Sequence, residues 1–142
     1  MRPPDRKRLA RLQRLEVVRA LAKQTALAAA AEAEGTLAQL VALADRTGQL
    51  ANDYAARRDL ADGAALTQIA RFREGLDTVT AMTRSDAERA RIVADGRMRE
   101  LGEAERRRQA AEDRARAEAR ALNQAGQQPQ LGSRKAIGTG LE

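Results

Sequence analysis

The chain has 142 residues and a formal net charge of +6, and Ala supplies 32 of its residues, whereas Phe and Tyr occur once each and Trp is absent. So few large side chains cannot fill the interior of an ordinary globular domain, although they can fill a thin seam between helices. Cys and His are also absent, which excludes disulfides, the usual zinc sites and the commonest general base.

The positive charge belongs to the beginning of the chain. Residues 1–23 contain eight Lys or Arg and only two acidic residues, while the other 119 residues contain 18 basic and 18 acidic groups. We find no secretory signal and no apolar run close to the roughly 20 residues of a membrane span. Asp5 and Glu16 count against a mitochondrial transit peptide, so the sequence predicts a cytoplasmic protein.

The first predicted helix covers residues 5–58, after a flexible N-terminus at residues 1–4. Pro3 and Pro4 cannot lie inside a helix, and Asp5 can cap the one that follows. Apolar residues then recur every three or four positions, which predicts one apolar stripe. This stripe consists of Leu12, Leu15, Val18, Ala22, Ala26, Ala29, Ala33, Leu37, Leu40, Leu43, Thr47, Leu50 and Tyr54.

A polar turn is predicted at residues 59–63, where Asp62 can cap a second helix over residues 64–122. The second helix has a stripe whose steps are mostly three or four residues, and Arg108 interrupts it. Its members are Leu66, Ile69, Phe72, Leu76, Val79, Thr83, Ala87, Ala90, Ala94, Met98, Leu101, Ala104, Ala111, Ala115 and Leu122. Residues 123–142 lose this periodicity and gain Gly, Gln and Pro, which predicts a disordered tail.

The two stripes match each other if the chain folds back near residue 63. Facing residues of an antiparallel pair then have numbers that add up to about 126, so that Tyr54 meets Phe72 and Thr47 meets Val79. Both stripes stay in phase over their whole length. The predicted fold is therefore all-α, a long antiparallel two-helix coiled-coil hairpin with a disordered C-terminal tail.

Nothing in the sequence indicates catalysis, a cofactor or a metal. The neighbouring carboxylates, Glu103 with Glu105 and Glu112 with Asp113, lie among arginines on a predicted helix surface, where ion pairing is the simpler interpretation. We therefore expect a non-enzymatic protein that acts through its surface.

Two surfaces are candidates for binding. The basic N-terminal segment could contact nucleic acid or an acidic membrane surface, although the absence of aromatic residues nearby disfavours nucleic acid. Tyr54 and Phe72 fall on matching levels of the two helices, and two helices cannot enclose both rings completely. We expect part of that aromatic and aliphatic cluster to face solvent as a docking surface.

These features together resemble the flagellar export protein FliJ family over roughly residues 9–122. The resemblance depends on an LxxLxxL spacing in a basic first helix, a Tyr before a polar turn, and an FxxxLxxV spacing after it: Leu9, Leu12 and Leu15; Tyr54; Phe72, Leu76 and Val79. This chain has one Tyr before the turn where some members have two, and its turn is shorter.

The resemblance implies an antiparallel coiled coil that serves the bacterial flagellar type III export apparatus in the cytoplasm, at the inner face of the cell membrane. Its implied partners are the hexameric export ATPase, the cytoplasmic domain of the export-gate membrane protein, and export chaperones. Gate docking would fall to Tyr54, Phe72, Leu76 and Val79, and ATPase engagement to Arg11, Arg14 and Arg19. The stalk protein of an injectisome-type secretion system would have the same sequence features, and whether the chain is a monomer or a dimer stays open.

Overall fold

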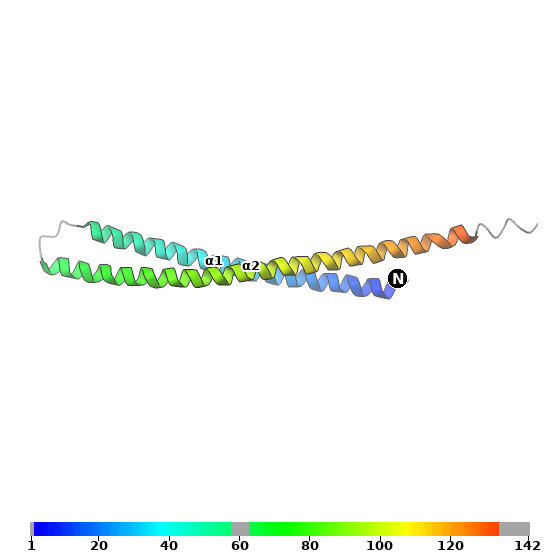
Figure 1. Cartoon of the computed structure of the whole chain (residues 1–142), viewed down its shortest axis with the longest axis horizontal. Coiled ribbons are helices and arrows are strands. Elements are labelled where there is room, and N and C mark those ends of the chain that lie inside the picture. The colour runs from blue at the N-terminus through cyan, green and yellow to red at the C-terminus, as the bar shows by residue number, and fades with distance from the viewer. Residues whose placement is uncertain (1, 58–62, 134–142) are drawn as a thin grey trace, which may run out of the picture. The chain divides into compact units, whose positions relative to one another are not determined.

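The computed structural model describes residues 2–57 and 63–133, with side chains through residue 127. Within this part of the chain two helices are present, α1 (Arg6–Ala56) and α2 (Gly63–Ser133). They pack against each other as an all-α helical hairpin, which confirms the predicted fold class (Figure 1).

Helix α1 begins where its capping residue predicts. The Asp5 carboxylate accepts a hydrogen bond from the Lys7 N–H (3.0 Å), and the Asp5 carbonyl accepts one from the Leu9 N–H (3.0 Å). The Arg57 N–H donates to the Tyr54 carbonyl (3.4 Å) just beyond the other end. The helix is thus shorter than the predicted range 5–58, and Gly63 is the first residue of α2 rather than the last of the turn. The rest of the predicted turn, at residues 59–62, lies outside the described residues.

Helix α2 is longer than predicted, because it continues past Leu122 to Ser133. The prediction of a disordered tail is therefore wrong for residues 123–133, and residues 134–142 lie outside the described part of the chain. Loss of the apolar stripe removes a packing face, but Ala, Leu and Gln still favour helical backbone. Residues 123–127 are exposed, so this extension of α2 is not held by burial of their side chains.

The chain divides into two compact units, each made from both helices. We call Met1–Ala26 with Leu101–Glu142 the terminal unit, and Leu27–Glu100 the central unit. Their cross-helix contacts confirm the predicted register. Residue numbers add up to 126 for the ring pair Tyr54 and Phe72, to 127 for the hydroxyl pair Thr47 and Thr80, and to 128 for the ion pair Lys23 and Glu105.

The seam of α1 lies about one position away from the predicted stripe at four places. Val18, Ala22, Leu43 and Leu50 are exposed, whereas the next residue in each case faces α2. These next residues are Arg19, Lys23, Ala44 and Ala51. The observed positions 12, 16, 19, 23, 26, 30, 33, 37, 40, 44, 47, 51 and 54 alternate strictly between steps of four and three, which is the 3.5-residue period of a coiled coil.

The seam of α2 differs from its predicted stripe in a similar way. Thr80 is buried (6% exposed) instead of Val79 (46% exposed), and Leu66, Phe72 and Met98 are also exposed. Arg108 does not interrupt the seam, because it is half-buried within it. Glu118, ten residues later, is buried.

The most deeply buried apolar positions of the seam have small side chains, whereas the large side chains in or beside the seam are only partly covered. The buried apolar residues are all alanines: Ala30, Ala44, Ala51, Ala87, Ala94, Ala111 and Ala115. Within the described residues no large side chain is fully buried. An alanine side chain buries little apolar area. Each unit therefore leaves exposed much apolar surface whose burial would normally stabilise a fold.

Helix α1 is long and apolar enough to cross a membrane, although little of its most apolar stretch is buried. The sequence analysis expected no apolar run close to the length of a membrane span. Judged by helix length and composition, α1 is such a run, so that expectation is wrong. The many alanines of α1 produce this apolar character, and an Ala-rich helix of a coiled coil meets the same criterion. The finding is accordingly weak evidence for a membrane span.

Candidate functional site

The four residues predicted to dock form one cluster in the central unit. The Tyr54 and Phe72 rings meet edge to face, with their centroids 4.8 Å apart and their planes at 67°. Such pairs stabilise by about 0.5–1.5 kcal/mol beyond the area that they bury. Leu76 and Val79 follow Phe72 at positions i+4 and i+7, on the same stripe of α2.

This cluster is only partly covered by the hairpin. Phe72 is 48% exposed and Val79 46% exposed, whereas Tyr54 and Leu76 are half-buried beneath them. Leu50, which is 41% exposed, extends the cluster by one turn of α1. The prediction that part of the aromatic cluster faces solvent is confirmed. We call Leu50, Tyr54, Phe72, Leu76 and Val79 the aromatic patch.

Arg57 adds a charged group to the aromatic patch. Its guanidinium carbon lies 4.6 Å from the centroid of the Tyr54 ring, a cation–π contact at the end of α1. The sequence analysis did not single out Arg57. Its position three residues after the only Tyr, directly after the end of α1, is the signal that could have found it.

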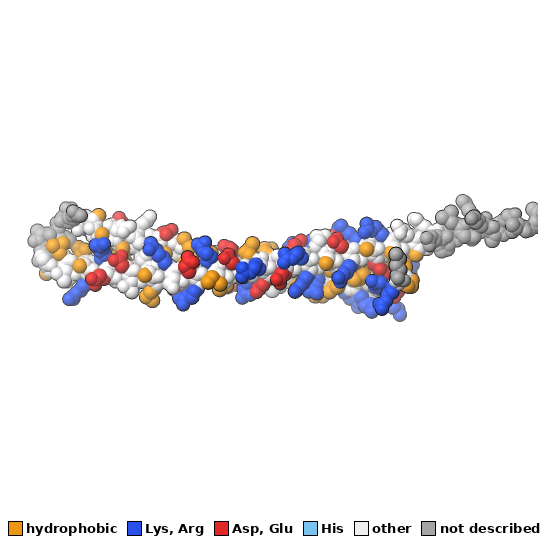
Figure 2. Space-filling view, in the orientation of Figure 1, with side chains coloured by type: hydrophobic (Ala, Val, Ile, Leu, Met, Phe, Trp, Pro, Cys, Tyr) orange, Lys and Arg blue, Asp and Glu red, His pale blue; other side chains and the backbone are white. Residues whose placement is uncertain are grey.

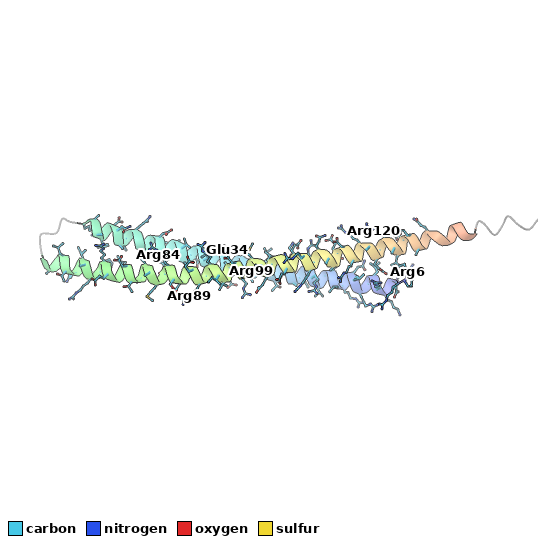
Figure 3. All side chains as sticks on the ribbon, in the orientation of Figure 1. Arg6, Glu34, Arg84, Arg89, Arg99 and Arg120 are labelled. Carbon is cyan, nitrogen blue, oxygen red and sulfur yellow. The ribbon has the colours of Figure 1, made fainter. Side chains whose placement is uncertain are left out.

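The central unit also has a groove with mainly polar walls. Its volume is about 510 Å³, and it is lined by Asp45, Gly48, Gln49, Asn52, Asp77, Thr80, Ala81 and Arg84. Arg84, which is labelled between α1 and α2 in Figure 3, extends from α2 toward Gly48 of α1. The central unit thus has a groove lined mainly by polar side chains in addition to the aromatic patch.

The three basic residues predicted to engage an ATPase do not share one face. Arg11 and Arg14 are exposed on the outer face of α1, where Arg14 Nε donates to the Ala10 carbonyl (3.3 Å). Arg19 is half-buried in the seam. Five residues at about 100° each rotate Arg19 by roughly 140° from Arg14 around the helix axis. Arg19 lies about 80° from Arg11, so what distinguishes it from Arg11 and Arg14 is chiefly its partial burial in the seam.

Charge is concentrated in the terminal unit. Its residues include 16 Lys or Arg and 8 Asp or Glu, a net charge of +8, whereas the central unit has 10 basic and 12 acidic residues, a net charge of −2. In Figure 2 the basic side chains gather on the terminal unit near the N-terminus. An acidic partner would be attracted to this unit, more strongly at low salt.

Two of the four carboxylates considered for catalysis, Glu105 and Glu112, are held in ion pairs. Arg108 binds Glu105 through two hydrogen bonds (Nε to Oε2, 2.9 Å; Nη2 to Oε1, 2.8 Å) and Glu112 through a third (2.8 Å). Lys23 Nζ reaches Glu105 from α1 at 2.9 Å. The hydrogen bonds from Arg108 and Lys23 lower the pKa of Glu105 to about 2, and those to the two glutamates raise the pKa of Arg108.

A carboxylate with so low a pKa is a poor proton donor or acceptor near neutral pH. The arrangement is that of a cross-helix ion-pair network, which also includes Arg116 bound to Glu112. Within the described residues no group of three or more acidic, His or Cys side chains could hold a metal ion.

A second charged contact connects the helices near the start of α1. Glu118 is 9% exposed and accepts a hydrogen bond from the Asp5 N–H (2.9 Å), and Arg8 Nε lies 3.9 Å from its other oxygen. Sequence spacing alone assigned no role to Glu118. Comparison of the chain with protein-family models, with curated proteins and with solved structures gives no match.

Proposed function

We propose that the chain is a non-enzymatic component of the bacterial flagellar type III export apparatus that couples the hexameric export ATPase to the export gate. The observation that carries the proposal is the aromatic patch, whose Phe72 and Val79 are nearly half exposed on a helical hairpin. Hydrophobic side chains that stay exposed in one cluster are suited to bind a partner. The resemblance to the FliJ family supplies the identity of that partner.

Gate docking is tested by Phe72→Asp in the full chain. Because Phe72 is 48% exposed, we expect the variant to keep its helicity. It should lose most of its affinity for the cytoplasmic domain of the export gate, since the aspartate removes the centre of the aromatic patch and introduces a charge that contact would desolvate. Binding is measured by calorimetry and helicity by circular dichroism.

Ile92→Asp is the matched control, because Ile92 belongs to the same unit and is 68% exposed, outside the aromatic patch. It makes the same change of charge and should bind the gate domain normally. Unchanged binding by Phe72→Asp would remove the gate-docking assignment.

ATPase engagement is proposed for the terminal unit, whose net charge of +8 suits an acidic ring. Replacing Arg11, Arg14 and Arg19 together by Glu should weaken association with the hexamer at physiological salt. The control is a triple variant in which Glu replaces Arg71, Arg73 and Arg99. These three arginines are exposed in the central unit. Equal weakening by both triple variants would show a response to net charge alone and would contradict a role for the terminal unit.

The stalk protein of an injectisome-type secretion system is the nearest alternative within this class of function. Its ATPase and gate differ from the flagellar ones. Pull-down of the bound ATPase from cells, followed by its identification, distinguishes the two systems.

Attachment to an acidic membrane surface is a second candidate, favoured by one exposed stripe of α1. Lys7, Arg11, Arg14, Val18 and Leu21 follow one another at steps of three or four residues, and Val18 and Leu21 are 58% and 63% exposed. Basic and apolar groups on one helix face suit anionic lipid. Sedimentation with phosphatidylglycerol vesicles tests this candidate, and Leu21→Asp should abolish any binding that occurs.

A further inference from the structure

A small groove of the terminal unit is lined by three arginines that converge from both helices. Its volume is about 170 Å³, and its walls are formed by Leu15 and Arg19 of α1 and by Arg107, Ala110, Ala111 and Arg114 of α2. Arg19 is half-buried, and Ala111 lies at the base of the seam with 3% exposure. Small side chains below the guanidinium groups leave room for a ligand between them.

These three arginines have no acidic partner within the described residues, which separates them from their neighbours. Arg108 and Arg116 are paired with Glu112, Lys23 with Glu105, and Arg8 with Glu118. None of these pairs includes Arg19, Arg107 or Arg114. Three like charges at one groove repel one another, so an anion between them would relieve an unfavourable interaction.

The spacing of the arginines indicates the form of that anion. Arg107 and Arg114 are seven residues apart on α2, which corresponds to about 10 Å along the helix axis. Arg19 of the other helix faces the interval between them. A line of positive charge of this length fits an extended anion with several charges better than a single carboxylate, and guanidinium forks match phosphate oxygens.

We propose that this groove binds a linear oligophosphate, a chain of two or more phosphoryl groups, either free or as part of a nucleotide. The only aromatic residues of the chain, Tyr54 and Phe72, belong to the central unit. A nucleobase therefore has no ring to stack on in the groove, and the phosphate chain supplies the binding. The site goes beyond the proposed export function, because it requires neither the ATPase nor the gate.

The test is calorimetric titration of the full chain with tripolyphosphate at physiological salt in a phosphate-free buffer. The double variant Arg107→Gln with Arg114→Gln should bind at least roughly tenfold more weakly, since it loses two charge-assisted contacts. Arg106→Gln with Arg120→Gln is the matched control, because it removes the same charge from the same helix outside the groove. The control should bind within about twofold of wild type.

Thermal unfolding gives a second measurement that does not depend on heat of binding. Tripolyphosphate should raise the Tm of the wild-type chain and of the control, and should leave that of the Arg107 and Arg114 variant nearly unchanged. Because both groove residues are exposed, the variant is expected to fold, and circular dichroism without ligand verifies this.

Comparison of ligands distinguishes the sources of the phosphate chain. If ATP binds as tightly as tripolyphosphate, the shared phosphate chain is the recognised group and the proposal is supported. The proposal is overturned if both double variants weaken binding equally, which indicates general attraction to a basic surface. It is also overturned if poly-glutamate or single-stranded DNA binds the groove more tightly than tripolyphosphate, because the site would then serve an acidic peptide or nucleic acid.

Discussion

Arg108 and Glu118 are charged residues at positions of the seam where apolar residues are the rule. Arg108 satisfies its donors on Glu105, Gln109 and Glu112 of its own helix. Glu118 accepts a backbone hydrogen bond from Asp5, the residue just before α1. Each charge is tolerated because its polar atoms are bonded and its surroundings are not completely dry. Sequence periodicity treated Arg108 as an interruption, because periodicity alone does not account for hydrogen-bond partners.

The pH dependence of stability should include a contribution from Glu105. Its pKa is about 2 in the folded chain, below its ordinary value of 4.5. The stabilisation is therefore fully present above about pH 4.5 and is lost as the pH falls from there toward 2. Glu105→Gln should have a lower Tm than wild type at pH 7, and the difference should shrink as the pH falls through this window.

Thermal unfolding followed by circular dichroism between pH 2 and 7 measures this effect. Glu103→Gln is the control, since Glu103 is an exposed glutamate two positions away and has no ion pair among the described contacts. If the two variants depend on pH in the same way, the network around Arg108 does not contribute to stability.

At the scale of the helices, the sequence predicted both the register and the approximate seam. The fold-back near residue 63 follows from matching two stripes, and the pairing of Tyr54 with Phe72 agrees with it. The residues that each helix turns toward the other helix were less predictable. Choosing the larger of two neighbours selected Leu43 and Leu50, whereas closely packed helices bury the alanines beside them. The distance between the two helices decides which residue fits into the seam. The size of a single side chain does not reveal that distance.

Two glycines inside the helices are positions where stability can be increased. A Cβ atom added at Gly35 or Gly75 would meet no atom within 4 Å. Gly35→Ala and Gly75→Ala should each raise the free energy of unfolding by up to about 1 kcal/mol, because alanine restricts the unfolded chain and favours the helix. Urea unfolding measures the change.

Gly102→Ala provides the comparison, since its new Cβ would lie 3.4 Å from Arg106 Nη1, in contact with that side chain instead of in open space. Its gain should be smaller. A loss of stability at Gly35 or Gly75 would mean that these positions contact something in solution, such as a second copy of the chain.

At the scale of the whole molecule, little apolar area is buried by the chain alone. Alanines form the buried apolar seam, while residues such as Leu21, Ile92 and Met82 are more than 60% exposed. The urea m-value should consequently lie near or below the lower end of the roughly 1–3 kcal/mol/M found for small proteins. A larger value at high protein concentration that falls on dilution would indicate self-association, which sedimentation can verify.

The candidate sites were predictable to different degrees. The sequence placed Tyr54, Phe72, Leu76 and Val79 in one cluster because two aromatics stand at matching levels of a hairpin. It could not assemble the arginine groove, because Arg19, Arg107 and Arg114 come together only after the seam of α1 is known. Arg19 lies one residue away from the stripe that the sequence predicted, and its contacts depend on that shift.

The hydroxyl pair of Thr47 and Thr80 has a consequence for how the helices stay aligned. Alanines repeat at seven-residue intervals, as Ala44 with Ala51 and Ala87 with Ala94 show, so a slide of one heptad would bring similar small residues together. The hydrogen bond from Thr80 Oγ1 to Thr47 Oγ1 (3.0 Å) exists in one alignment only. The alanine layers would match again after a slide of seven residues, but the threonine pair would not. A few such residues thus give the two helices one unique alignment.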